Sequence, residues 1–236
     1  SNLYARRDHI NVVATGAFFN FDSYISAQRD PKYVTFINPS PAKGLAIFAK
    51  LAVVCKEELP DLKFLVINTR GNFAQMVSML HEKDKSDVHP FKPTDFSNVD
   101  ITGSQKDMRP VYAITKALLA PSLWYESWGR VTSEAVINEI PVVCSTSGGL
   151  AEGMAGCGEI LEAPQHCVDD HLSIPTDEEI RPWVDALKKA LESDYSEKFK
   201  EAKVTLSPER ALERTLQAFR PLINESGCDN PLYYLK

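Results

Sequence analysis

The chain has 236 residues, a formal net charge of −6, and a composition that is 44% hydrophobic and 25% charged. This composition is typical of a globular protein, and the length suffices for one large α/β domain or two small ones. The acidic balance argues against a nucleic-acid partner, and no apolar run approaches the roughly 18 residues that cross a bilayer.

Strand-like and helix-like segments alternate along the first part of the chain. Residues 33–37, YVTFI, are β-branched and aromatic, which predicts a strand. Ser40-Pro41 offers an N-cap followed by proline at the first helical position, so a helix is expected to start there. Its apolar face consists of Leu45, Phe48, Ala49, Ala52 and Cys55. The apolar run at 63–68 predicts a strand buried on both faces, and a helix follows at about Asn72 to Leu80.

The middle of the chain begins with a polar segment, residues 81–98, whose two prolines predict a long loop. A short strand is expected at 99–102 and a helix within 107–116. The run ALLAPS, at 117–122, predicts another strand. A further helix is expected at about Gly129 to Asn138.

The last part of the chain is predicted to hold strands at 141–145 and 158–163, helices near 177–192, 195–203 and 208–222, and an extended tail at 224–236. Strands separated by helices of this length predict a parallel sheet with helices on both faces. Right-handed crossovers make this a doubly wound, Rossmann-like α/β fold. In such sheets, ligands bind beyond the carboxyl ends of the strands.

The five cysteines are odd in number and irregularly spaced, so they predict free thiols in a reducing compartment, and we expect a cytoplasmic protein. A zinc site is the alternative, because four metal-binding side chains lie close in the sequence: Cys157, His166, Cys167 and His171. Their spacing lacks the paired arrangement of zinc modules. We therefore expect no metal site.

The segment 121–152 combines several features of an anion site. Gly129 allows a tight entry into the next helix, and the free amides of the first helical turn carry partial positive charge. Such amides bind phosphate without any side chain. Arg130 lies in this turn, where a cation is unfavourable unless an anion is near. Glu126 and Glu134 flank the turn, and carboxylates there accept hydrogen bonds from sugar or ribose hydroxyls.

Two further signals follow other strands. Lys43 is expected in the first turn of the helix that starts at Ser40-Pro41, where a bound diphosphate would reverse the unfavourable effect of the helix dipole. Ser147-Gly148-Gly149 offers backbone amides after a strand. Each feature alone is ordinary, because glycine is common at turns and charged side chains are usually on the surface. Their order at successive strand ends favours a shared anion site.

Four blocks carry a family resemblance: NPSPAKG, VDITGSQKDM, GEILEAP and the segment from Val111 to Glu152, with its two glutamates spaced E-x7-E. In content and order they resemble the nucleotide-sugar-binding half of a retaining GT-B glycosyltransferase. The most similar group is glycosyltransferase family four, the glycosyl transferases group 1 type, and the resemblance covers about residues 30–192. The E-x7-E element is fairly specific where it follows PS and precedes PVV and GG.

The resemblance implies roles for three side chains. Lys43 would bind the donor diphosphate and assist its departure. Glu126, the first glutamate of the E-x7-E element, would contact the donor sugar as the second catalytic residue. Glu134, the second glutamate, would bind the nucleotide ribose. The implied reaction moves a sugar from a nucleoside diphosphate sugar, UDP- or GDP-linked, to an acceptor hydroxyl.

The resemblance also extends the nucleotide site to loop positions. The turn Ser127-Trp128-Gly129-Arg130 would hold phosphate through backbone amides, Gln105 would border the base, and Gly148 would belong to the same site. The family implies no cofactor and no bound Mg²⁺, because protein cations stabilise the diphosphate instead.

One departure from the family concerns the diphosphate site. The family usually has an arginine five residues before the lysine, and this chain has Asn38 there. Loss of a bidentate cation should weaken binding or leaving-group stabilisation. We hypothesise that Arg130 replaces the missing arginine from the facing helix.

The chain is expected to contain only the second of the two GT-B domains. Ser1-Asn2 is typical of a tag-cleavage scar. Residues 1–30 are interpreted as a lead-in from a missing N-terminal domain, 31–192 as the nucleotide-sugar-binding domain, and 193–236 as C-terminal helices and a tail packed on it. The acceptor site and the family's catalytic histidine would lie in the missing domain, so this chain alone is expected to bind donor without transferring sugar. Membrane association of the full-length enzyme stays open.

Two other functions are compatible with these residues. One is a non-catalytic nucleotide-sugar-binding module, degenerate at Asn38. The other is a nucleotide-sugar epimerase or hydrolase of the same architecture, which would consume donor without an acceptor. A dinucleotide oxidoreductase is disfavoured, because no G-x-G-x-x-G follows the first strand.

Overall fold

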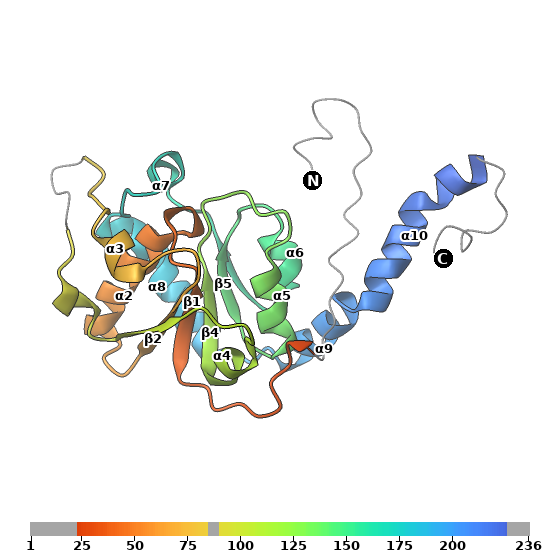
Figure 1. The fold of residues 1–236 in the computed structure, drawn as a ribbon, viewed down its shortest axis with the longest axis horizontal. Coiled ribbons are helices and arrows are strands. Elements are labelled where there is room, and N and C mark those ends of the chain that lie inside the picture. Colours follow the sequence, from red (N-terminus) through yellow and green to blue (C-terminus); the bar gives the residue numbers. More distant parts are fainter. Residues whose placement is uncertain (1–22, 85–89, 226–236) are drawn as a thin grey trace.

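The computed structural model describes residues 23–84 and 90–225, with side-chain surroundings described as far as residue 220. These residues form one six-stranded parallel sheet, in the order β3-β2-β1-β4-β5-β6, with helices on both faces (Figure 1). The predicted doubly wound, Rossmann-like fold is confirmed. The predicted tail lies outside the described residues from 226 onward.

The strands are β1 (Tyr33–Ile37), β2 (Lys63–Asn68), β3 (Val99–Gly103), β4 (Thr115–Ala120), β5 (Val142–Ser145) and β6 (Gly158–Leu161). All six were predicted, with errors only at their ends. β4 begins two residues earlier than expected because Thr115 pairs with Tyr33, and its hydroxyl lies 2.7 Å from that of Thr35. β6 ends at Leu161, two residues earlier than expected.

The α-helices are α2 (Leu45–Glu58), α3 (Phe73–Val77), α4 (Arg109–Ile114), α5 (Arg130–Ile137), α6 (Leu150–Met154), α7 (Gln165–Asp169), α8 (Asp177–Glu192), α9 (Ser196–Thr205) and α10 (Pro208–Glu225). The helix bounds predicted for α8 are confirmed, and a capping box between Thr176 and Glu179 begins it. The predicted 72–80 helix is shorter, with Asn72 as its N-cap. The predicted loop at 81–98 contains a 3-10 helix, η3 (Pro93–Phe96).

The prediction of one continuous helix from Ser40-Pro41 was wrong. A 3-10 turn, η2 (Pro41–Lys43), comes first, and α2 begins only after Gly44, whose φ is 84°. Ser40 forms no side-chain cap there. A Cβ at Gly44 would lie 1.9 Å from the carbonyl oxygen of Pro121, so the loop after β4 leaves room only for glycine at this break. Lys43 therefore ends a separate turn and lies outside the first turn of α2.

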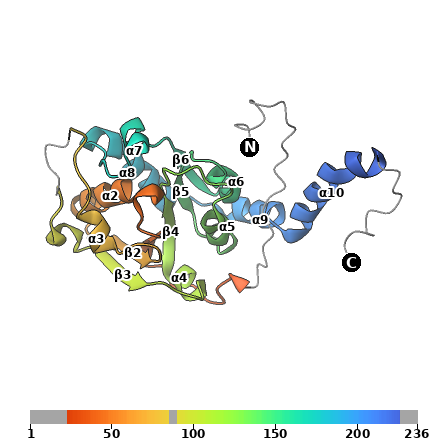
Figure 2. The ribbon, with the colours of Figure 1, turned by 45° about the horizontal axis from the view of Figure 1, so that its top comes forward.

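Alternate strand residues face the two helical layers, as expected of a doubly wound sheet. Leu119 belongs to the cluster under α2 and α8, whereas Leu118 belongs to the cluster under α5 and α9. Figure 2 shows α2 and α8 grouped together, apart from α5 and α6. β1 and β4 are neighbours at the centre of the sheet although β2 and β3 intervene in sequence. Their carboxyl ends therefore form the switch point at which such folds bind ligands.

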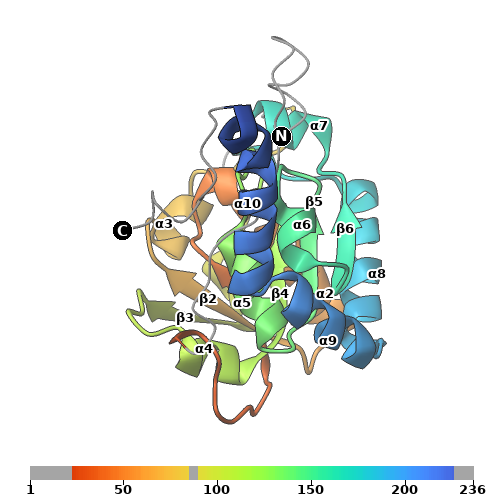
Figure 3. The same ribbon diagram turned by 90° about the vertical axis from the view of Figure 1, so that its right-hand side faces the viewer.

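The C-terminal helices differ in their packing. α9 contacts α5, and its residues Phe199 and Ala202 join the core cluster under that layer. α10 leads away from the sheet (Figure 1), so it lies in front of α5 in Figure 3, and it exposes Leu212, Leu216 and Phe219. Within the described residues, no helix is both long enough and apolar enough to cross a bilayer.

Candidate functional site

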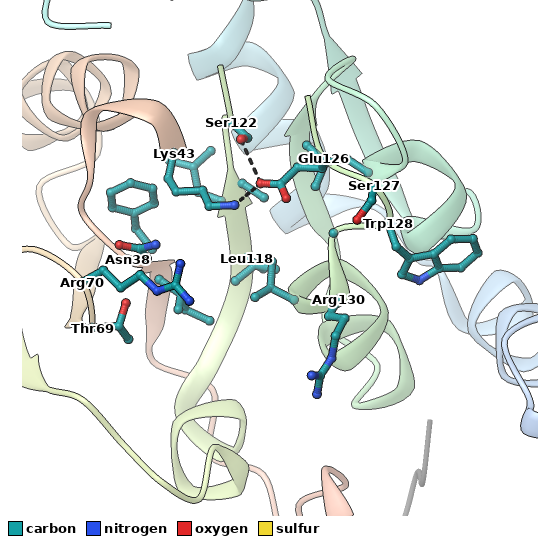
Figure 4. A pocket seen from close by; sticks show the side chains of 17 residues that line it. Asn38, Lys43, Thr69, Arg70, Leu118, Ser122, Glu126, Ser127, Trp128 and Arg130 are labelled. Carbon is teal, nitrogen blue, oxygen red and sulfur yellow. Dashed lines mark hydrogen bonds and ion pairs between the residues drawn. The ribbon is translucent and has the colours of Figure 1, made fainter. Parts of the chain in front are cut away.

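A pocket of about 420 Å³ lies at the switch point of the sheet. It is bordered by the loop after β1, the loop after β2, and the segment from β4 into α5, as Figure 4 shows. The polar side chains that line it include Asn38, Lys43, Arg70, Ser122, Glu126 and Arg130. The sheet order thus brings together residues from three separate parts of the sequence.

Lys43 is positioned by the packing of η2 against the loop after β4. The backbone amides of Leu123 and Trp124 both donate to the carbonyl oxygen of Ala42, at 3.0 Å each. The close contact between Gly44 and Pro121 completes this junction. The ammonium group of Lys43 is thereby fixed at the pocket.

Lys43 and Glu126, the two residues expected to be catalytic, form an ion pair across the pocket (Figure 4). The hydroxyl of Ser122 donates to the same carboxylate oxygen of Glu126, at 3.0 Å. The Glu126 side chain is 16% exposed and that of Lys43 is 33% exposed. A lysine ammonium carries three donor hydrogens, so Lys43 retains donors for an anion while it orients the carboxylate.

Gly148 packs against the backbone of Glu126. The amide of Gly149 donates to the carbonyl oxygen of Glu126, at 2.8 Å. Gly148 has a φ of 67°, and a Cβ there would lie only 2.0 Å from the same oxygen. Gly148 does not line the pocket, so its contribution to the site is close backbone packing.

The turn that enters α5 forms one wall of the pocket. Gly129 is the N-cap of α5 with a φ of 74°, and no side chain caps the helix. A Cβ at Gly129 would lie 2.4 Å from the Leu150 side chain, so only glycine fits without rearrangement. An uncapped helix start with its amides at a pocket is an anion-binding arrangement.

The other members of the predicted turn have unequal roles. Ser127, Trp128 and Arg130 all line the pocket together with Gly129. The indole of Trp128 points away from its centre (Figure 4) and donates to the hydroxyl of Ser133, at 3.0 Å. The Trp128 side chain therefore anchors the turn, while its backbone borders the pocket.

Glu134 lies behind the pocket wall and is only 6% exposed. The hydroxyl of Tyr112 donates to one carboxylate oxygen at 2.6 Å, and Arg130 donates to the other at 3.2 Å. Glu134 is not among the residues that line the pocket. A ribose hydroxyl that binds Glu134 would have to share, with Arg130, the carboxylate oxygen to which Arg130 donates.

The guanidinium of Arg130 is held on the Glu134 side of the pocket. It donates to the hydroxyl of Tyr24 at 2.5 Å and lies 5.6 Å from the centre of that ring. In Figure 4 it points away from Lys43. The structure thus gives no support to the hypothesis that Arg130 replaces the arginine missing at Asn38.

Gln105 lies apart from the pocket. It follows β3, at the edge of the sheet, where its side-chain amide donates to the carbonyl oxygen of Gly103 at 3.1 Å. The side chain is exposed and does not line the pocket. A role beside the base stays a prediction.

Sequence reasoning missed Arg70, which lines the pocket from the loop after β2. The available signal was its place two residues beyond the end of that strand, where ligands bind in doubly wound sheets. With Arg70, the pocket lining holds three cations, the others being Lys43 and Arg130, and one carboxylate, Glu126. A cation-rich pocket in a chain of net charge −6 favours an anionic ligand.

A family model described as "Glycosyl transferases group 1" matches residues 32–192. This match spans more than half of the chain. The chain belongs to the glycosyl transferases group 1 family. The expected family resemblance is therefore confirmed. A search of curated proteins found no match.

Solved glycosyltransferase structures share the fold of this group 1 chain. A TarM variant from S. aureus, in complex with Fondaparinux, alpha-GlcNAc-glycerol and UDP, has a TM-score of 0.61 at 20% identity, covering 92% of this chain and 41% of its own. The pneumococcal O-GlcNAc transferase GtfA, in complex with UDP and GlcNAc, has a TM-score of 0.61 at 14% identity. The match covers 91% of this chain and 40% of GtfA. HepE from Anabaena, in complex with UDP and glucose, has a TM-score of 0.57 at 16% identity. The match covers 90% of this chain and 56% of HepE. The chain thus spans 40 to 56% of these structures' lengths.

The alternative zinc site finds no support in this group 1 chain. In the described residues, no three His, Cys, Asp or Glu side chains gather as a metal site would need. The ring nitrogens of His166 instead lie 2.8 Å from the Ser173 hydroxyl and 2.9 Å from Glu179. Cys157 and Cys167 are buried free thiols, and burial raises their pKa values to about 11 and about 12.

Glu134 gives this group 1 domain a testable pH dependence. Burial raises its pKa, and this effect outweighs the hydrogen bond from Tyr112 and the charge of Arg130. A raised folded-state pKa contributes stability that is present below the unfolded pKa, about 4.3, and is lost as pH rises through the folded value. We expect wild type to lose unfolding free energy relative to Glu134→Gln as pH rises from about 4 to 7.

Urea unfolding at several pH values measures this difference. Glu58→Gln is the matched control, because hydrogen bonds from Arg181 and Lys188 lower the pKa of Glu58. The stability that Glu58 contributes is present above its unfolded pKa and is lost as pH falls. The difference in unfolding free energy between wild type and Glu58→Gln should therefore change with pH in the opposite direction. Equal slopes for the two variants would contradict the assigned role of burial at Glu134.

Proposed function

We propose that this chain is the donor-binding domain of a retaining glycosyltransferase. The whole enzyme transfers a sugar from a nucleoside diphosphate sugar to an acceptor hydroxyl and needs no metal ion. The observation that carries this proposal is the meeting of Lys43, Glu126 and the uncapped start of α5 around one cation-rich pocket. Family membership supports the reaction class.

The proposed chemistry centres on the leaving diphosphate. Negative charge grows on it as the bond to the sugar breaks, so donors fixed around it lower the barrier. Lys43 supplies one fixed cation, and the first-turn amides of α5 supply partial positive charge from the opposite wall. Glu126, held by Lys43 and Ser122, accepts hydrogen bonds from sugar hydroxyls and orients the donor.

The acceptor is proposed to bind outside this chain, in a further domain of the whole enzyme, where the remaining catalytic groups lie. In support, the chain spans only 40 to 56% of three similar structures. UDP is the first nucleotide to test, because each of those three structures contains it. The relative affinities of the chain for UDP and GDP decide between UDP- and GDP-linked donors.

Amide chemical shifts of the ¹⁵N-labelled chain test this proposal. Titration with UDP should move the signals of Ser127, Gly129 and Arg130, because a bound phosphate accepts hydrogen bonds from that turn. The signal of Lys188, on α8 and remote from the pocket, is the control and should stay fixed. Shifts confined to other surfaces, or none with UDP, GDP, ADP or dTDP, would overturn the proposal.

A further inference from the structure

Asn38 and Arg70 bring two loops together at the edge of the pocket. The amide of Asn38 donates to the carbonyl oxygen of Ile67, at 3.0 Å, near the end of β2. A Cβ at Gly71 would lie 3.2 Å from the carbonyl oxygen of Pro39. The loop after β2 thus packs directly on the loop after β1, and both side chains line the same pocket (Figure 4).

Arg70 is the pocket cation without a counter-charge in the described part of the chain. Lys43 pairs with Glu126 and Arg130 pairs with Glu134, but no described carboxylate pairs with Arg70. Its side chain is exposed and lines the pocket. An anion that enters the pocket meets the full charge of this guanidinium.

Asn38 has a buried acceptor that no described group satisfies. Its side-chain oxygen is buried and has no hydrogen-bond partner among the described residues. A buried acceptor left without a donor is unfavourable, because it has lost its hydrogen bonds to water. A guanidinium has five donor hydrogens, so one group can serve this oxygen and a phosphate at once.

The backbone conformation at Asn38 favours asparagine over arginine at this position. Its φ is 69°, in the left-handed region that asparagine tolerates better than most residues. An arginine here would carry backbone strain, because its Cβ crowds the following carbonyl oxygen. Arg70, from the loop after β2, supplies a cation to the same pocket lining.

We propose that Arg70 binds the donor diphosphate from the loop after β2, with the side-chain oxygen of Asn38 orienting its guanidinium. This inference rests on the proposed function, since it assigns a residue to the same nucleotide site. The diphosphate then lies between Arg70 and Lys43 on one side and the start of α5 on the other.

Calorimetric titration of the whole chain tests this assignment. UDP, GDP, ADP and dTDP are titrated into wild type, and the tightest of the four is then titrated into Arg70→Gln. We expect about a tenfold loss of affinity, because a charge-assisted hydrogen bond is removed. Arg70→Lys should fall between the two, since it keeps the charge but not the planar fork. Arg70→Gln should weaken the binding of the matching nucleoside monophosphate less than that of the diphosphate.

Arg210→Gln is the matched control, because it removes an equal charge from an exposed arginine on α10. Thermal melting confirms that each variant is folded. If wild type binds a diphosphate and Arg70→Gln binds it as tightly as Arg210→Gln does, the assignment of Arg70 is wrong while the proposed function stands. If folded wild type binds none of the four diphosphates, the proposed function fails and this inference fails with it.

Discussion

Replacing Lys43 by alanine is expected to weaken nucleoside diphosphate binding about a hundredfold, or about 2.7 kcal/mol, with the fold intact. The substitution removes the cation that pairs with Glu126 at the pocket. It also leaves a carboxylate that is only 16% exposed to face the incoming phosphates without a counter-charge. Calorimetry with the tightest of the four diphosphates measures the loss.

A double-mutant cycle separates these two contributions. In Lys43→Ala/Glu126→Gln the repulsive charge is absent, so the double variant should recover part of the affinity that Lys43→Ala loses. Lys50→Ala is the matched control, because Lys50 lies on α2 and pairs with Asp177 away from the pocket. Equal affinities for wild type and Lys43→Ala would contradict the role of Lys43.

Replacing Gly148 by alanine is expected to lower the free energy of unfolding by about 3 kcal/mol or more. The new Cβ would lie 2.0 Å from the Glu126 carbonyl oxygen, which forces the backbone of that loop to move. Because the same loop carries the Glu126 carboxylate, donor binding should also weaken. Urea unfolding and calorimetry measure the two effects.

Gly156→Ala supplies the matched control for this prediction. Gly156 also has a positive φ, 78°, but a Cβ there would meet nothing within 4 Å. Its substitution therefore carries only the strain of a left-handed alanine, about 1 kcal/mol. The additional loss of unfolding free energy in Gly148→Ala, relative to Gly156→Ala, measures the clash with the Glu126 backbone. If both variants unfolded at the same urea concentration, close packing at Gly148 would not support the site.

Local patterns in the sequence were sufficient for most of the fold. Continuous apolar runs such as 63–68 indicate strands covered on both faces, and the spacing of apolar residues indicates α2 and α8. The five-residue helices α6 and α7 were missed, because one turn and a half is too short for periodicity. The break at Gly44 could not be predicted either, since it depends on contact with the distant Pro121.

The site was also predicted only in part, because local motifs mark some of its residues and distant contacts bring in the others. Lys43, Glu126 and the turn at Gly129 follow strand ends in recognisable motifs, and they do meet at one pocket. Arg70 follows β2 in no such motif, and only the packing of two loops brings it into the same pocket lining as Asn38. The burial of Glu134 depends on Tyr112, from another helix.

The most direct test of donor binding is calorimetric titration of the wild-type chain with UDP, GDP, ADP and dTDP, each paired with its nucleoside. We predict that one diphosphate binds at least tenfold more tightly than the other three and than its own nucleoside, a difference of about 1.4 kcal/mol. That result would identify the donor class and locate the affinity in the phosphates. Absence of binding by the folded chain, or equal affinity for diphosphate and nucleoside, would contradict the assignment of this pocket to a nucleotide sugar.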